Sequence, residues 1–461
     1  MICSHMLAAD AGMAVLNDGG NAVDAAIATA LTLSVVDPPN CTLAGYGGYM
    51  VVKKPGDPNA EVVCFNTAVP KRYSPDDVAD TPRITGFVYG PRSVSVPGVP
   101  AGLLKAHEQF GSVEFKTLCT SAIGIAKDGF KVGKNLAKAL EWAGTQIAAT
   151  NPAWRDIFAP GGAPFRLGDR LVQADLSKTL EYYAQSPSSF YTGPIGQKLV
   201  NDVQASGGVL ESSDMAAMRA VVLPADRCEF QGYELQGTVS EESGFGILKD
   251  TVNSLTVAAS GLRPTPKEYI SALQRAWASR SAEFTTPKSP IQHTNHFCVS
   301  DAQGMMVACT FTLGPLWFGS LSVLEGTGLV LNCGMNLIRQ NRRSGDFVVI
   351  NNLTPVIGHD AQNRWYAAGT PGGTRIPAVV LRLFLETAVV GRSLQDAIDL
   401  PRIAVRPDGT PELEAIFDID EPYKTLGAED FYGPASIIRR DTNGDIEIGQ
   451  DPRFEVGVAV S

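Results

Sequence analysis

The sequence is poor in the side chains that most often hold metal ions, and it places them without a recognisable spacing. Its 461 residues include 5 histidines and 8 cysteines, which are scattered along the chain without a C-x-x-C pair. Structural zinc sites need such ligands at short, fixed spacings, so we expect no structural metal. Several cysteines lie within apolar runs, where a free thiol behaves as a small hydrophobic side chain. We therefore predict a reduced, intracellular protein without a disulfide framework.

Basic charge is also scarce. Lys and Arg number 38 against 48 Asp and Glu, which gives a net charge of −10. This excess of negative charge disfavours nucleic acid and anionic membranes as partners. No apolar run reaches the length of a membrane span, and Met1–His5 has neither the basic start nor the apolar core of a signal peptide. We expect a cytoplasmic protein, and an amino-terminal truncation of the sequence is the open alternative.

Linkers and repeats are missing as well. A chain of 461 residues would ordinarily suggest more than one domain, yet no low-complexity segment or internal repeat divides it. Strand patterns alternate with helix patterns, and strands cluster around both termini. We predict one continuous α+β domain over residues 1–461, in which two stacked, mostly antiparallel sheets lie between helical layers.

A threonine stands in front of the most distinctive strand pattern. Thr294 precedes the alternating run from Phe297, a turn follows at 301–304, and a second strand pattern runs over 305–312. This arrangement predicts a hairpin with Thr294 at its open end. A hydroxyl there becomes a nucleophile if a base lies beside it, and the α-amine released by a cut before Thr294 would be such a base. The competing interpretation is an ordinary edge hairpin with a surface threonine.

A glycine pair lies between a second predicted strand and a helix. Gly372 and Gly373 follow the strand pattern at 364–367 and precede the apolar run 377–384, which is entered through Pro377. Backbone N–H groups exposed at such a helix start suit a developing oxyanion. A plain structural turn is the alternative. Near the amino terminus, the run Gly19–Ala26 opens a helix over 22–36, which is apolar all round and so predicted to be buried.

Together these stretches resemble the γ-glutamyltransferase (glutathione hydrolase) family of N-terminal-nucleophile hydrolases. The resemblance runs from Ser4 to Arg453, and its most specific parts are His5–Met50, Val94–Gly102, Thr294–Asp301 and Pro371–Ile376. It implies an αββα sandwich. It also implies self-cleavage between His293 and Thr294, which would leave a large subunit of residues 1–293 and a small subunit of residues 294–461 as a heterodimer.

The resemblance also implies the catalytic residues. Thr294 matches the nucleophile, Thr312 matches a threonine that hydrogen-bonds it, and Gly372 and Gly373 match the pair whose N–H groups hold the oxyanion. No cofactor is expected, because a threonine, its own amine and backbone donors suffice for acyl transfer. The residue after the nucleophile is usually threonine, and here it is Asn295, which we expect to position the α-amine or the substrate differently.

The segment before the nucleophile is short. The amphipathic helix expected over 269–284 leads almost directly into Gln292, with only 285–291 as a linker. The family normally carries a long additional segment here, so this departure bears directly on self-cleavage.

The family's glutamyl-binding positions have lost their charges. An arginine that binds the α-carboxylate is matched by Asn66, and an asparagine and an aspartate that bind the amino group are matched by Gly314 and by Leu337, or Asn336 in a shifted alignment. Paired serines that hold the carboxylate are matched by Asn351 and Asn352. We call Asn66, Gly314, Leu337, Asn351 and Asn352 the clamp positions. A structural role is the alternative for Asn66, and Arg339, Arg342 and Arg343 are candidates for a replacement anion site.

We therefore predict a self-processing amidohydrolase or acyltransferase that cleaves a γ-glutamyl-like or related amide through a threonine acyl-enzyme, with altered acyl-group specificity. Its partners would be a small-molecule amide and a water or amine acceptor. One alternative is a weak hydrolase of glutathione or γ-glutamyl conjugates. The other is an uncleaved pseudoenzyme that acts as a scaffold or binding protein.

Overall fold

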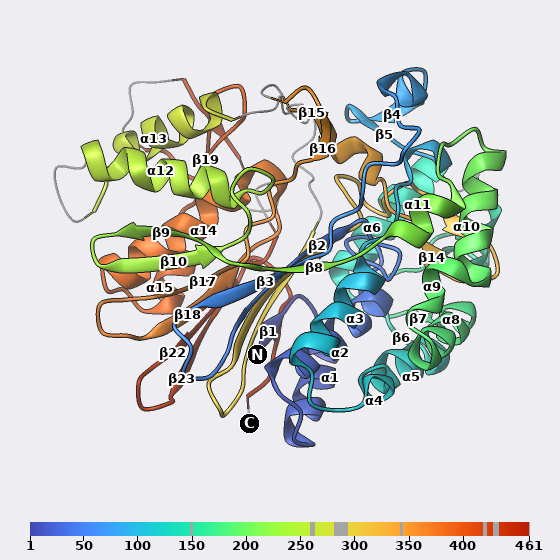
Figure 1. Ribbon diagram of the computed structural model, residues 1–461, viewed down its shortest axis with the longest axis horizontal. Coiled ribbons are helices and arrows are strands. Elements are labelled where there is room, and N and C mark those ends of the chain that lie inside the picture. Colours follow the sequence, from blue (N-terminus) through green and yellow to red (C-terminus); the bar gives the residue numbers. More distant parts are fainter. Residues whose placement is uncertain are drawn as a thin grey trace.

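The computed structural model describes residues 1–147, 151–258, 263–280, 294–341, 344–417, 422–426 and 433–460. Strands occupy the middle of the molecule and helices cover them on two sides, as Figure 1 shows. The two ends of the described chain lie close together, because the N-terminal strand pairs with the last strand.

The first sheet has seven strands, and every neighbouring pair in it is antiparallel. In spatial order they are β24 (Gly457–Val458), β1 (Ile2–Cys3), β11 (Asn295–Ser300), β12 (Met306–Thr312), β2 (Gly47–Lys53), β3 (Ala60–Cys64) and β8 (Val221–Pro224). The hairpin predicted after Thr294 is confirmed as β11 and β12, which occupy the interior of this sheet rather than its edge.

The second sheet has six strands and is also antiparallel throughout. Its order is β23 (Ile446–Gln450), β22 (Ser436–Arg440), β18 (Trp365–Gly369), β17 (Val356–His359), β10 (Tyr233–Gly237) and β9 (Asp226–Phe230). Strands from both sides of Thr294 contribute to each sheet. The two fragments expected from self-cleavage would therefore share one core.

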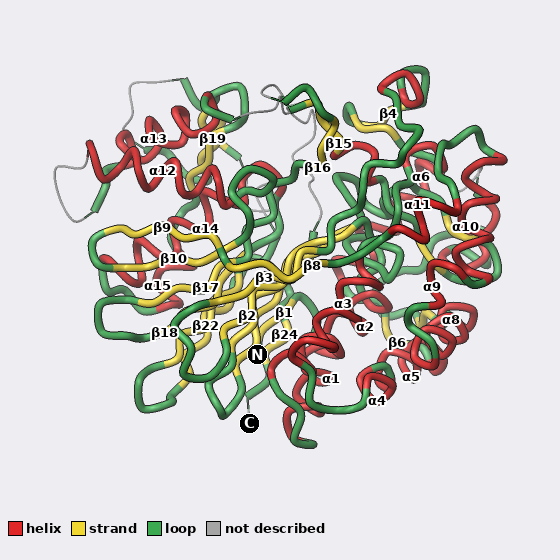
Figure 2. The backbone as a smooth tube through the Cα atoms, in the orientation of Figure 1, coloured by secondary structure: helices red, strands yellow, loops and turns green. Residues whose placement is uncertain are grey.

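The two sheets pack face to face, with β11 and β12 against β18 and β22. Strands β2, β11 and β12 are buried along their whole length because a sheet covers one face and helices cover the other. Figure 2 shows yellow strands, β2 among them, between red helices on both sides. The predicted α+β sandwich of two antiparallel sheets between helical layers is confirmed.

One helical layer covers the first sheet. Helix α2 (Ala22–Val36) packs on β11 and β12, and all of its residues are buried, as its uniformly apolar sequence predicts. It begins where the Asn21 side chain accepts hydrogen bonds from Val23 N and Asp24 N, while the Asp24 carboxylate accepts from Asn21 N. The other helices on this side are α1 (Met6–Asn17), α3 (Val99–Phe110), α4 (Phe115–Leu118), α5 (Thr120–Asp128), α6 (Lys134–Ile147), α7 (Pro152–Phe158), α8 (Ala174–Gln185), α9 (Ser189–Thr192), α10 (Pro194–Ala205) and α11 (Ser212–Ala217).

A second helical layer covers the other sheet. Helix α12 (Phe245–Ala258) packs on β9, α14 (Ile376–Phe384) on β18, and α15 (Leu394–Asp399) on β22 and β23, while α13 (Pro266–Ala278) packs on α12. Short ribbons complete the described chain: β4 (Arg83–Ile84) with β5 (Phe87–Val88), β6 (Phe130–Lys131) with β7 (Arg170–Leu171), β13 (Val323–Leu324) with β14 (Leu329–Val330), β15 (Ile338–Gln340) with β16 (Phe347–Val349), and β19 (Ile403–Val405) with β20 (Pro411–Leu413) and β21 (Lys424–Thr425).

Candidate active site

Thr294 lies at the open end of the central hairpin. It immediately precedes β11 and is 5% exposed. The register pairs Asn295 with Phe311, so Thr294 and Thr312 are next in line at the same end of the two strands. The Thr312 hydroxyl exchanges hydrogen bonds with Gly314, accepting from its N–H at 3.1 Å. The fold thus places the two predicted catalytic hydroxyls on neighbouring strands, while His293 lies outside the described residues.

The predicted glycine turn connects β18 to α14. Gly372 has φ 136° and Gly373 has φ 59°, backbone conformations that side chains other than glycine rarely adopt. The two glycines lead into a short 3₁₀ turn over Gly373–Arg375, and α14 begins at Ile376. The turn therefore needs glycine for its backbone, and it lies directly before the start of α14, the kind of place where backbone N–H groups can serve an oxyanion.

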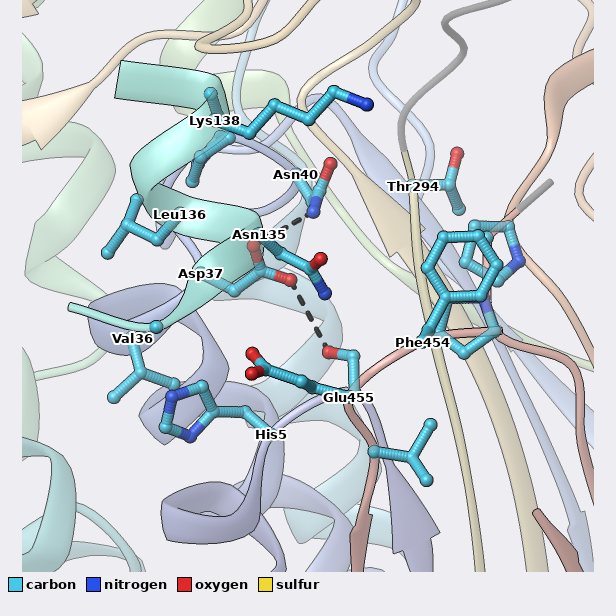
Figure 3. A pocket seen from close by; sticks show the side chains of 18 of the residues that line it. His5, Val36, Asp37, Asn40, Asn135, Leu136, Lys138, Thr294, Phe454 and Glu455 are labelled. Atoms are coloured by element: carbon cyan, nitrogen blue, oxygen red, sulfur yellow. Dashed lines mark hydrogen bonds between the residues drawn. The ribbon is translucent and has the colours of Figure 1, made fainter. Parts of the chain in front are cut away.

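Thr294 and Gly372 line one cavity of about 510 Å³, shown in Figure 3. Its wall comes from segments that are distant in the sequence: the end of β1, the end of α2, the start of α6, the glycine turn, and the chain just before β24. Its described lining residues are Ser4, His5, Met6, Val36, Asp37, Pro39, Asn40, Gly133, Asn135, Leu136, Lys138, Ala139, Thr294, Trp317, Pro371, Gly372, Arg375, Gly433, Pro434, Phe454, Glu455 and Val456.

Asp37, a half-buried carboxylate in this wall, organises a polar cluster beside the nucleophile. Its Oδ1 accepts from Asn40 Nδ2 at 2.8 Å, and its Oδ2 accepts from Asn295 Nδ2 at 2.7 Å and from Ser4 Oγ at 3.3 Å. The Ser4 hydroxyl also donates to Asn295 Oδ1 at 2.9 Å. Burial raises the pKa of Asp37 to about 7, and the hydrogen bonds from Asn40, Ser4 and Asn295 act in the opposite direction. Asn295 is fully buried, and through its amide Asp37 is connected to the residue that directly follows Thr294.

Four other ionisable side chains line the cavity: Lys138, Glu455, Arg375 and His5. Figure 3 shows Lys138 reaching from α6 with its ammonium directed to the side on which Thr294 lies, and Glu455 on the opposite wall near His5. Arg375 is buried in an ion pair with Glu412, at 2.7 Å from Nε to Oε2. Burial lowers the pKa of His5 to about 4, so this imidazole is neutral at physiological pH.

Two of the clamp positions meet in the structure. Asn351 Nδ2 lies 3.4 Å from Asn66 Oδ1 and 3.4 Å from Tyr49 Oη. The Asn352 Oδ1 atom is buried without a hydrogen-bond partner among the described residues. Asn66, Asn351 and Asn352 are neutral, so the charges predicted to be missing at these positions are not restored by their own side chains.

The remaining clamp positions play local roles. Gly314 has φ 123°, and a Cβ there would meet Cys333 Sγ at 2.6 Å. Leu337 packs against the hydrophobic core at the end of a 3₁₀ turn. The alternative Asn336 is committed elsewhere, because its amide bonds both the N–H and the C=O of Val88. These contacts make Asn336 a structural link to β5.

The arginines considered as an anion site are only partly described. Arg339 belongs to β15 and donates to the neighbouring Ile338 carbonyl at 3.0 Å, and burial lowers its pKa. Arg342 and Arg343 lie outside the described residues.

A half-buried arginine, Arg280, lies near the clamp positions and is not among the site residues predicted from the sequence. Arg280 Nη2 donates to the main-chain oxygen of Asn351 at 3.0 Å, and Nη1 donates to that of Ser243 at 2.5 Å. Burial lowers the pKa of Arg280 to about 10, so the guanidinium stays charged at neutral pH. Its position after α13 gave no sign of this contact, which joins residues that are 71 apart in the chain.

Within the described residues, no group of three or more His, Cys, Asp or Glu side chains is arranged to hold a metal ion. Within the same ranges, no helix is both long enough and apolar enough to cross a membrane.

Comparison with known proteins adds independent findings. The family model described as gamma-glutamyltranspeptidase matches residues 8–292 and 266–460. The glutathione hydrolase proenzyme of Pseudomonas sp. (strain A14) is 26% identical over 555 residues, covering 100% of this chain and 93% of that protein. The acylase ACY 1 proenzyme of Pseudomonas sp. (strain SE83) is 27% identical over 475 residues, covering 90% of this chain and 83% of that protein.

A solved structure supports the fold. The crystal structure of cephalosporin acylase from Bacillus halodurans aligns with a TM-score of 0.88 over 99% of this chain and 95% of that chain, at 23% sequence identity. This similarity extends over both sheets and both helical layers described above.

Proposed function

The chain belongs to the γ-glutamyltranspeptidase family, and from this premise we propose that it is a self-processing amidohydrolase or acyltransferase with Thr294 as its nucleophile. Membership makes it an amide-processing enzyme of that family, and the identity of its site residues is the proposal. The observation that carries it is the cavity shared by Thr294 and Gly372, with Thr312 next to Thr294 across the hairpin.

Two acyl transfers use the same atoms. In the first, Thr294 Oγ attacks the carbonyl carbon of the His293–Thr294 peptide, the C–N bond breaks, and the hydroxyl proton goes to the nitrogen, which becomes the α-amine of Thr294. Water then hydrolyses the resulting ester, which restores the Thr294 hydroxyl and releases the carboxyl group of His293. In the second, the α-amine takes the proton from Oγ while Oγ attacks the substrate carbonyl. The N–H groups of Gly372 and Gly373 would hold the oxyanion in both steps. The first transfer, self-cleavage, would yield a heterodimer of residues 1–293 and 294–461.

Intact-mass spectrometry of the purified protein tests the nucleophile. We expect two fragments from the wild type, one full-length chain from Thr294→Ala, and slower cleavage in Thr294→Ser, which keeps a hydroxyl. Thr294→Ser is the matched control, because both variants disturb the strand end while only one removes the attacking atom. A wild-type chain that stays intact after long incubation would contradict self-processing and favour the binding or scaffold alternative.

We further propose that the acyl group is not a standard glutamyl group. The clamp positions carry no charge, and a zwitterionic head would leave water without an ionic partner, which is costly in an enclosed site. Each lost charged contact is worth about 1.5–3 kcal/mol.

Three p-nitroanilides of equal reactivity separate the possibilities. The γ-glutamyl compound has a zwitterionic head, the glutaryl compound lacks the ammonium, and the butanoyl compound lacks both charges. We expect kcat/KM to be at least tenfold higher for glutaryl or butanoyl than for γ-glutamyl anilide. A preference for the γ-glutamyl compound, or efficient hydrolysis of micromolar glutathione, would overturn the altered specificity.

A weak γ-glutamyl hydrolase is the second candidate, and Arg280 favours it. Its guanidinium contacts the main chain of Asn351, a position matched to the family's carboxylate-binding serines. A half-buried positive charge there could attract the acyl carboxylate in place of the lost arginine. The conservative Arg280→Lys variant tests this. If Arg280 binds the acyl carboxylate, as the second candidate requires, the ratio of kcat/KM for the glutaryl anilide to that for the butanoyl anilide falls in this variant. Under the first candidate, that ratio does not change.

A further inference from the structure

The clamp positions do not line the cavity beside Thr294. Among its described lining residues, none is Asn66, Gly314, Leu337, Asn351 or Asn352, although Thr294 and Gly372 are both included. Acyl transfer needs the acyl group on one side of the reacting carbon and the amine on the other. If the clamp side holds the acyl half, the cavity is left for the amine half.

The size of the cavity exceeds what hydrolysis needs. One water molecule takes about 30 Å³ in the liquid, whereas the cavity measures about 510 Å³, within the range of sites for small organic ligands. Side chains such as Trp317, Phe454, Leu136 and Val456 give it apolar walls. These walls suit an amine with an apolar body.

Asp37 gives the cavity a specific polar feature. The donors that the described residues offer to its carboxylate are all neutral: Asn40, Asn295 and Ser4. Ser4 has a single hydroxyl proton, and its shorter bond, 2.9 Å, goes to Asn295 Oδ1 rather than to Asp37 at 3.3 Å. A carboxylate accepts about four hydrogen bonds, so Asp37 retains capacity for a cationic N–H donor.

The other ionisable groups around the cavity are paired, neutral or exposed to solvent. Arg375 is neutralised by Glu412, and His5 is neutral because burial lowers its pKa. Lys138 and Glu455 are exposed, so solvent screens them. Within the described residues, Asp37 is therefore the charged group of the wall whose interaction with a bound cation is screened least by water.

We propose that this cavity binds the amine half of the amide, and that Asp37 recognises a second, cationic nitrogen on an apolar amine. The inference rests on the proposed function, because it assigns the amine side of the same reaction. In transfer, the amine nitrogen attacks the acyl carbon of the Thr294 ester, the C–N bond forms, the C–Oγ bond breaks, and one amine proton goes to Oγ. The cationic nitrogen at Asp37 takes no part in this exchange and fixes the position of the nucleophilic one.

Three amines of equal length test the inference by isothermal titration calorimetry on the purified protein: 1,5-diaminopentane, pentylamine and 5-aminopentanoate. We expect the diamine to bind at least tenfold more tightly than either of the others. Asp37→Asn should remove this preference, since a hydrogen bond between charged groups is lost. Glu455→Gln removes the rim carboxylate instead, and a loss of preference there equal to that in Asp37→Asn would overturn the assignment.

A second variant guards against misfolding of Asp37→Asn, whose side chain also holds Asn40 and Asn295. Ala139→Phe fills the cavity from α6 and replaces no side chain of the polar cluster, and Glu141→Phe places the same side chain on the exposed face of that helix. We expect Ala139→Phe to weaken binding of all three amines at least tenfold and Glu141→Phe to leave it unchanged. Undiminished binding in Ala139→Phe would place the amine elsewhere and refute the proposal.

Catalysis supplies a second measurement. With glutaryl p-nitroanilide as donor, the ratio of glutaryl-diamine product to free glutarate reports how one acyl-enzyme divides between amine and water, whatever the rate of its formation. We expect this ratio to fall at least tenfold in Asp37→Asn. Failure of the proposed function shows as an intact chain that releases no nitroaniline, whereas a cleaved, active enzyme with no diamine preference refutes the amine site alone.

Discussion

His296, two residues after the predicted nucleophile, should make the protein sensitive to acid. His296 is buried between the two sheets, where Nδ1 lies 2.8 Å from Thr310 Oγ1 and Nε2 lies 3.1 Å from Cys298 Sγ. Burial lowers the pKa of His296 from 6.5 to about 3. Below about pH 6.5 His296 is therefore protonated in the unfolded chain, while in the folded chain it stays neutral down to about pH 3. The free energy of unfolding decreases as the pH falls through this range.

The size of the effect follows from the linkage relation. One pKa unit corresponds to about 1.36 kcal/mol, and pH 5 lies about 1.5 units below the unfolded value, so His296 alone should remove about 2 kcal/mol of stability between pH 8 and pH 5. His5 acts in the same direction, because its pKa is lowered to about 4. Asp37 acts in the opposite direction: its raised pKa makes it most stabilising below pH 3.8, and this contribution is lost as the pH rises through about 7.

A difference measurement isolates His296 from these other groups. The assay is urea unfolding at pH 8 and pH 5, followed by circular dichroism, in a Thr294→Ala background so that each molecule is one chain. His296→Gln keeps a donor and an acceptor but does not titrate. We expect the stability gap between the parent and this variant to shift by about 2 kcal/mol in favour of the variant at pH 5.

His107→Gln on α3 is the control variant, because it also removes one histidine. His107 is half-buried, and its ring bonds the Val113 carbonyl. If the gap between parent and His296→Gln is the same at both pH values, the imidazole is not kept neutral by its burial, and the reasoning fails.

Three further outcomes are expected. Glu412→Gln should cost about 3–5 kcal/mol of stability in urea unfolding, because it leaves Arg375 charged and buried, whereas Lys178→Ala, which breaks an exposed ion pair, should cost less than about 1 kcal/mol. Asn66→Arg should leave γ-glutamyl anilide turnover equal or higher but short of full family activity, since the amino-group contacts are still missing; a loss of turnover would show that Asn66 is misassigned. Dialysis against EDTA should leave anilide hydrolysis unchanged, and activity that is lost and then restored by zinc would contradict the absence of a metal from the mechanism.

Local patterns in the sequence were enough to predict the main elements. The apolar run after Asn21 predicts helix α2, since a capping residue and a continuous apolar surface both act within a few turns. The alternating run after Thr294 predicts β11 and β12 for the same local reason. Helix α13 begins at Pro266 rather than at the predicted Tyr269, because the Thr265 side chain caps it by accepting a hydrogen bond from Glu268 N.

The resemblance to the family predicts more residues of the site than local sequence patterns do. It placed Thr312 and Gly372 in roles that depend on partners elsewhere in the chain, and the structure puts Gly372 on the same cavity as Thr294. It also matched Asn66 and Asn351, which lie 285 residues apart in the chain yet contact each other. These assignments rest on the order of motifs rather than on any physical reading of single residues, and their catalytic and binding roles remain predictions.

Only the tertiary structure decided what surrounds the nucleophile. Asp37 follows a buried helix in the sequence and reads there as its polar end, but the fold turns it toward Asn295, 258 residues away. Arg280 reads as the end of a helix and contacts Asn351 through the fold alone. The sequence determined the strands and helices because those depend on near neighbours. The cavity depends on which strand ends and helix ends meet, and that is settled by the packing of two sheets whose strands come from both halves of the chain.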